Sequence, residues 1–425
     1  MRSQQSATNW RSVVGFAVVA TLLAAAPSAQ TEEPPVFALT NARIIPVSGA
    51  AIEKGTVVLR NGIIEAVGSG VSIPGDARVF DASGLTIYPG FIDALSDAGI
   101  EETRSQPATA ARGGIPAFLQ QQQPQPQQQQ QQQSGSATSP DERRGLTPYL
   151  QAADILYPAA RKIESARSAG ITTALVAPNR GIFPGQSSLV NLAGAAVGNM
   201  VLKSPVALHI SLQGGGGFRG EYPGSLMGIF AHVKQTLLDA QHYETAWGIY
   251  QAQPGARRPE YSRSLHALQP ALKRQIPVVL PARTPAEVQR ALDLAAAFNL
   301  NLILSGGAEA GKIASLLKER NVPVLLTLKF PEREADADPE QEETLEVLRA
   351  RVEAPATAAV LARAGVRFAF QSGDMANPTD FVQNASKTIE AGLDKDLALR
   401  ALTLTPAEIF GVADRLGSIE KGKTA

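Results

Sequence analysis

Between residues 86 and 412, short apolar segments alternate with longer segments of helical character, and this alternation constrains the fold more than any other feature. Strands that alternate with helices are typical of a parallel sheet covered by helices, and such units over about 320 residues favour a closed (β/α)₈ barrel. The sequence therefore predicts an α/β barrel over residues 86–412, with one of its eight strands unassigned. The expected strands are Leu85–Ile92, Thr172–Ala177, Val206–Leu212, Pro277–Leu280, Leu302–Leu304, Val322–Leu328 and Arg367–Phe370. The expected helices are Tyr149–Ala169, Leu226–Tyr250, Pro285–Asn299, Ala308–Asn321, Ala354–Ala364 and Asp380–Ala391.

A strand-rich segment, residues 36–85, precedes the barrel. It contains three β-prone runs, and Asn61-Gly62 between the second and third is a strong hairpin signal. A sheet of about fifty residues is too small to close a core by itself. We therefore expect it to pair with residues 413–425, so that the two chain ends build a small composite β-sandwich.

The N-terminal residues 1–29 are typical of an export signal. Arg2 and Arg11 precede the uncharged apolar run Val13–Ala26, which small residues follow. A run of about 14 apolar residues is shorter than the roughly 20 that span a bilayer, which argues against the alternative of a membrane anchor. We expect cleavage, a periplasmic or secreted mature protein, and no membrane-spanning segment after cleavage.

A glutamine-rich stretch interrupts the barrel at residues 105–140. Its core, Gln120–Gln133, is broken only by two prolines and offers nothing that could pack. The composition predicts a disordered surface insertion. A protein-binding tract is the alternative.

Charge and cysteine content limit the partners and the chemistry. The chain has 39 Lys and Arg against 39 Asp and Glu, so no net field draws it to nucleic acid or to an acidic membrane. A small molecule or another protein is the expected partner, and the oligomeric state is not determined. Because the chain has no cysteine, a metal would need His, Asp, Glu or a modified Lys.

Three sequence motifs mark the two ends of the α/β part. Tyr88-Pro-Gly-Phe-Ile-Asp93 opens it, and residues 401–408 (Ala-Leu-Thr-Leu-Thr-Pro-Ala-Glu) and 415–423 (Arg-Leu-Gly-Ser-Ile-Glu-Lys-Gly-Lys) close it. In order and spacing these motifs resemble the composite-type amidohydrolases of the imidazolonepropionase and dihydroorotase kind. The resemblance implies a barrel with a β-sandwich, hydrolysis of non-peptide carbon–nitrogen bonds, and zinc or another divalent ion. In that family further strands follow the closing motif, so we expect a segment beyond Ala425.

The resemblance also implies where metal ligands would lie. The family's His-x-His after strand one falls on Leu95 and Asp97, and its histidines after strands five and six fall on Pro281 and Ser305. Only Asp374 matches the family's carboxylate after strand eight, which also acts as general base. Since one carboxylate does not make a zinc site, we expect no metal and no other cofactor. An oxygen-only Mg²⁺ or Mn²⁺ site from Asp93, Asp97 and Asp374 is the alternative.

The four histidines do not replace the missing ligands. His209 lies in an expected strand, where it is either a structural residue or projects into the barrel mouth. His232 and His242 lie about 80° and about 15 Å apart on one expected helix, too far to share an ion. His266 is isolated in the sequence.

Two loops remain as candidates for ligand contact. Gly181–Ser188 follows an expected strand, where barrels place substrate-binding loops, so Gln186 and Ser187 are candidate substrate contacts or parts of a structural turn. Gly215–Gly220 matches Gly-x-Gly-x-x-Gly, but Pro223 interrupts the route into the next helix, which favours a hinge over a nucleotide site.

Three functional hypotheses follow. The first is an exported amidohydrolase homologue with weak or no catalysis. The second is an active hydrolase with an oxygen-ligand metal site. The third is a binding or scaffold protein that uses the insertion at residues 105–140. The substrate does not follow from the sequence, because substrate choice depends on loops that vary within one fold.

Overall fold

The computed structural model describes residues 36–100 and 141–425, apart from residues 142, 144, 195, 213–222, 254, 334–337, 339, 341, 374 and 376. The expected signal peptide, the glutamine-rich insertion, Gly215–Gly220 and Asp374 therefore lie outside the described residues. Within the described part of the chain, no helix combines the length and the apolar character needed to cross a bilayer.

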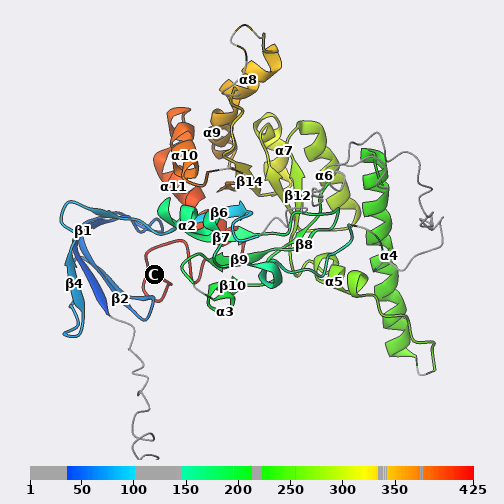
Figure 1. Cartoon of the computed structure of the whole chain (residues 1–425), viewed down its shortest axis with the longest axis horizontal. Coiled ribbons are helices and arrows are strands. Elements are labelled where there is room, and N and C mark those ends of the chain that lie inside the picture. The colour runs from blue at the N-terminus through cyan, green and yellow to red at the C-terminus, as the bar shows by residue number, and fades with distance from the viewer. Residues whose placement is uncertain are drawn as a thin grey trace, which may run out of the picture.

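The N-terminal part forms one five-stranded sheet (blue in Figure 1). The strand order is β3-β2-β1-β4, with β5 paired to β1. Asn61 and Gly62 join β2 to β3 with φ angles of 54° and 74°, as a type I′ hairpin requires, so the hairpin prediction is confirmed. The strands are β1 (Phe37–Ile44), β2 (Ile52–Arg60), β3 (Ile63–Gly68), β4 (Arg78–Asp81) and β5 (Thr86–Ile87).

The C-terminal tail lies against this sheet (Figure 1). The Ile64 N–H donates to the Lys423 carbonyl at 2.8 Å, and the Ala425 N–H donates to the Gly62 carbonyl at 2.8 Å. Ile419 is buried against Ile44 and neighbouring residues of the sheet. The last residues of the chain thus contact the N-terminal sheet through hydrogen bonds and a buried side chain.

The α/β part contains two more sheets. One has the order β10-β9-β7-β6, and the other has the order β15-β14-β13-β12-β11-β8. The first consists of β6 (Phe91–Ser96), β7 (Ile171–Val176), β9 (Ser188–Asn191) and β10 (Val201–Lys203). The second consists of β8 (Gly185–Gln186), β11 (Leu208–His209), β12 (Val278–Ala282), β13 (Leu302–Gly306), β14 (Val324–Thr327) and β15 (Phe368–Gln371).

These two sheets are joined at two places. β8 and β9 flank Ser187 and belong to one continuous segment, which pairs antiparallel with β11 on one side and with β7 on the other. At the other junction, the Gly373 N–H donates to the Leu95 carbonyl at 2.9 Å, which makes a parallel bridge between β6 and the end of β15. The alternation of strands and helices did not predict this antiparallel segment, residues 185–191.

Helices follow most of the parallel strands, and several differ from expectation. The segment 149–169 is not one helix but a 3₁₀ turn (Ala152–Ile155) and α2 (Arg161–Ser168), with Pro158 between them. The first strand of the α/β part is Phe91–Ser96 rather than 85–92. Of the other helices, five were not assigned from periodicity: α3 (Val197–Met200), α5 (Arg263–Leu272), α8 (Leu345–Glu353), α11 (Lys395–Leu402) and α12 (Leu404–Ile409). The remaining α-helices are α4 (Leu226–Ala252), α6 (Pro285–Ala297), α7 (Ala314–Glu319), α9 (Thr357–Arg363) and α10 (Asp380–Glu390).

The strands bury both of their faces, in two separate clusters. Successive side chains of a strand point to opposite faces, so residues two apart share a face. One face packs against the helices and carries residues such as Leu280, Leu304 and Phe370. The other forms a second cluster that draws on both sheets: Ile92, Ala94, Leu175, Leu189, Ala207, Val279, Ile303, Leu325 and Ala369. We call the face with this second cluster the inner face.

Candidate functional site

The inner face becomes more polar toward the carboxyl ends of the strands. The residue two positions beyond each inner-face apolar residue faces the same way. The strand register places such residues side by side, because Pro281 pairs with Ser305, and Thr327 pairs with Gln371. Five residues therefore continue the inner face at these ends: His209, Pro281, Ser305, Thr327 and Gln371. We call them the inner polar layer.

Two buried polar atoms of the inner polar layer have no partner within the described part of the chain. They are the Nε2 atom of His209 and the Oε1 atom of Gln371. His209 is 7% exposed, and burial lowers its pKa to about 4, so the imidazole is neutral at pH 7. The Gln371 Nε2 atom donates to the Leu325 carbonyl at 2.9 Å, which holds the amide in place. Buried polar groups are normally hydrogen-bonded, so these two atoms are suited to contact a ligand or an ordered water.

Asp93 holds the junction between the two sheets. Its carboxylate accepts the Ser372 N–H at 2.9 Å, the Leu95 N–H at 3.3 Å, and the Ser372 hydroxyl. Burial raises the pKa of the Asp93 carboxyl to about 6, although its hydrogen bonds with Ser372 oppose the shift. We call Asp93, Leu95, Ser372 and Gly373 the seam.

The positions that the resemblance assigns to metal ligands lie on or beside the strands named above. Pro281 and Ser305 are direct partners in adjacent strands β12 and β13, and Leu95 lies in β6 at the seam. Asp97 follows β6 and forms an ion pair with Lys162 of α2 at 2.5 Å. Asp374 lies outside the described residues.

This donor set does not fit a zinc ion. Leucine and proline side chains carry no donor atom, and a neutral serine hydroxyl is not among the usual zinc ligands. The alternative Mg²⁺ or Mn²⁺ site would use Asp93 and Asp97, whose carboxylates bind other groups of the protein. Asp93 accepts a hydrogen bond from Ser372, and Asp97 forms an ion pair with Lys162. Among the described residues, no three His, Asp or Glu side chains lie close enough to hold a metal.

Gln186 and Ser187 are buried, at 5% and 0% exposure, and their side chains contact the protein backbone. The Gln186 Nε2 atom donates to the carbonyls of Pro148 at 3.0 Å and Ala267 at 3.2 Å. The Ser187 hydroxyl donates to the Ala207 carbonyl at 3.3 Å. In this structure both side chains hold the antiparallel segment in place.

The remaining histidines lie on helices, away from the inner face. His232 and His242 are on α4, and His266 is on α5 next to the Tyr261 ring, with 5.7 Å between ring centroids. Burial, with Arg143 nearby, lowers the pKa of His232. Thr327 and Gln371 were missed as candidates from the sequence, although each stands two residues beyond an inner-face apolar residue.

Comparisons with known proteins agree with this architecture. Residues 277–425 match the amidohydrolase family. The structure is similar to an amidohydrolase from Thermotoga maritima MSB8, with a TM-score of 0.72, 25% identity and 92% of each chain covered. A second solved amidohydrolase, at 17% identity, has a TM-score of 0.53 over 92% of this chain and 91% of that one.

A curated relative matches over a short stretch only. The adenine deaminase of Listeria monocytogenes is 37% identical over 78 residues, which is 18% of this chain and 13% of that protein. The family match over residues 277–425 and the fold similarity over most of the chain lead to one conclusion: this part of the chain belongs to the amidohydrolase family, and the described chain as a whole has an amidohydrolase-like fold.

Proposed function

We propose that this protein is an amidohydrolase homologue that binds a small molecule at the mouth of a closed (β/α)₈ barrel and has weak or no hydrolytic activity. The two junctions between the sheets support closure, because they place β6, β7, the 185–191 segment, β11, β12, β13, β14 and β15 in one continuous order. In such barrels ligands bind at the carboxyl ends of the strands, where the inner polar layer lies.

The observation that carries the proposal is the pairing of Pro281 with Ser305. These neighbours occupy the two positions where the family's strand-five and strand-six histidines stand. A metal ion placed there would meet one side chain without a donor atom and one weak donor. Without those ligands, the chain lacks the means to acidify a metal-bound water, which the family's hydrolysis requires.

The chemistry of the inner polar layer favours an uncharged polar ligand. A neutral His209 offers one donor and one acceptor nitrogen, and the free Gln371 carbonyl accepts a hydrogen bond. Ser305 and Thr327 add hydroxyl groups that can donate or accept. A charged ligand would lose its hydration without a complementary charge among these side chains.

Metal content tests the proposal directly. Mature protein incubated with excess Zn²⁺ and then desalted should retain much less than one zinc per chain by elemental analysis. One tightly bound ion per chain, lost on Asp374→Ala, would refute the proposal and favour an active hydrolase. Adenine is the first substrate to assay, because the curated relative is an adenine deaminase.

A gain of function tests the placement of the site. Histidine introduced together at Leu95, Asp97, Pro281 and Ser305 should create zinc binding, because the four imidazoles would join Asp374 around one ion. Single substitutions should do little, since most of the coordination would remain with water. A quadruple variant that folds but binds zinc no better than the parent would show that these residues do not surround one site.

Export also remains a proposal. It rests on the signal-like residues 1–29. N-terminal sequencing of protein from the periplasmic fraction or the medium should give a chain that begins shortly after Ala29. A mature chain that retains Met1 in the cytoplasm would contradict it.

A further inference from the structure

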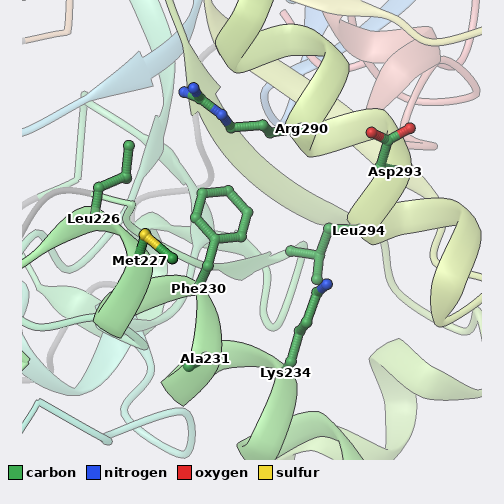
Figure 2. Close-up of a pocket in the computed structure, with 8 residues that line it drawn as sticks. All are labelled: Leu226, Met227, Phe230, Ala231, Lys234, Arg290, Asp293 and Leu294. Atoms are coloured by element: carbon green, nitrogen blue, oxygen red, sulfur yellow. The ribbon is translucent and has the colours of Figure 1, made fainter.

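A surface groove lies between α4 and α6, the helices that follow β11 and β12. Its volume is about 470 Å³. Figure 2 shows the Phe230 ring at its centre, with Leu226 and Met227 of α4 on one side and Leu294 of α6 on the other. These residues lie on helices outside the strands, so the groove is distinct from the inner polar layer.

The groove has large apolar side chains that are exposed to solvent. Met227 is 85% exposed and Leu226 is 45% exposed. Single exposed apolar residues are common on proteins, but a contiguous apolar groove with polar residues at its edge is typical of a binding site. The arrangement in Figure 2 is therefore suited to an apolar ligand segment.

Two cations of the described residues, Lys234 and Arg290, line the same groove without an ion-pair partner. Neither Lys234 of α4 nor Arg290 of α6 forms an ion pair within the part of the chain that the structure describes. The only carboxylate in the lining, Asp293, accepts a hydrogen bond from Gln289 at 2.9 Å, and Figure 2 shows it directed away from Phe230. The edge of the groove is thus positively charged while its floor is apolar.

We propose that this groove binds a small anionic amphiphile, namely a carboxylate with a linear alkyl chain. The alkyl chain lies along Met227, Phe230 and Leu294, and the carboxylate meets Arg290, while Lys234 on the other side of Phe230 adds a second positive charge to the groove. A small molecule is favoured over a protein partner because the volume falls in the range of about 300–1,000 Å³ for small-molecule sites. A stable protein interface needs about 800 Å² per partner, which is a much larger surface.

Calorimetric titration of the full mature protein with decanoate, below its micelle concentration, tests this site. Decanoate should bind, octanoate should bind several-fold more weakly, and each added methylene should tighten binding by up to about fourfold until the groove is full. Decanol should bind more weakly than decanoate, and decyltrimethylammonium more weakly still. Arg290→Gln and Lys234→Gln should each weaken decanoate by about two- to fivefold and leave decanol unchanged.

Matched variants separate this site from general effects on the protein. Arg349→Gln on α8 and Lys395→Gln on α11 remove the same charges elsewhere on the surface and should leave decanoate binding unchanged. Phe230→Ala should weaken the binding of both decanoate and decanol.

Equal binding of decanoate and decanol, or equal effects of the groove and control variants, would overturn the proposal. So would a concentration-dependent dimer that Met227→Ser dissociates, because the groove would then be an interface between two copies.

Discussion

Asp93→Asn should remove a pH dependence of stability that the wild-type seam carries. Asp93 is 2% exposed, and burial raises its pKa from 3.8 to about 6. Between these values the folded chain binds a proton more tightly than the unfolded chain does. The stability contributed by this group is therefore fully present below pH 3.8 and is lost as the pH rises through about 6. A shift of about two pKa units corresponds to about 3 kcal/mol.

The substitution keeps the shape of the seam. The amide oxygen of Asp93→Asn can still accept the N–H groups of Ser372 and Leu95, which both bind one carboxylate oxygen in the wild type. Asp93→Ala instead leaves these donors and the Ser372 hydroxyl unpaired in a buried place. It should therefore lower the free energy of unfolding by about 1–3 kcal/mol at about pH 3, where the Asp93 carboxyl is protonated in both the folded and the unfolded chain.

Urea unfolding measures both effects. The free energy of unfolding of the wild type, minus that of Asp93→Asn, should fall by about 3 kcal/mol between about pH 4 and about pH 7. Asp396→Asn on α11 is the control, because it removes an exposed carboxylate without touching the seam. Parallel pH profiles for the wild type and Asp93→Asn would refute the reasoning.

Three further predictions concern other titratable side chains. Burial lowers the pKa of His209 from 6.5 to about 4 in the folded chain, so the stability that neutral His209 contributes is present above pH 6.5 and is lost as the pH falls toward 4. His209→Gln should remove this pH-dependent loss of about 3 kcal/mol in the free energy of unfolding, measured by urea unfolding. Lys423→Met removes the cation that, together with Ser418, lowers the pKa of Glu420 to about 2. Thermal unfolding at neutral pH should therefore show a loss of about 1 kcal/mol in stability, and this loss should disappear near pH 2. Lys162→Gln breaks a partly exposed ion pair with Asp97 and should cost less than about 1 kcal/mol by denaturant unfolding, whereas a loss above that would show that the pair is effectively buried.

Local signals were sufficient to place the well-defined elements. α6 begins where Thr284 accepts the Glu287 N–H at 3.3 Å and Glu287 accepts the Thr284 N–H at 3.4 Å, a reciprocal cap within four residues. The hairpin at Asn61-Gly62 depends on two residues that tolerate positive φ. Both features are decided by residues close together in the chain, so the sequence predicts them.

The misplaced elements depended on distant contacts or on a local break. The segment 149–169 has helical composition, but Pro158 lacks the N–H that a continuous helix needs, and α2 begins only at Arg161. β8 and β9 are short and antiparallel, and an antiparallel strand needs no helical crossover to its neighbour. The alternation of strands and helices therefore could not reveal this segment.

The sequence by itself determined the family resemblance and which residues that resemblance assigns to the family's ligand positions, because motifs and side-chain chemistry are local properties. Only the tertiary structure decided which polar groups meet. Asp93 contacts Ser372 across 279 residues of sequence, and the unpartnered atoms of His209 and Gln371 come to the same face of different strands. Such contacts depend on strand register and on the order of strands in the sheets, which residues far apart in the chain fix together.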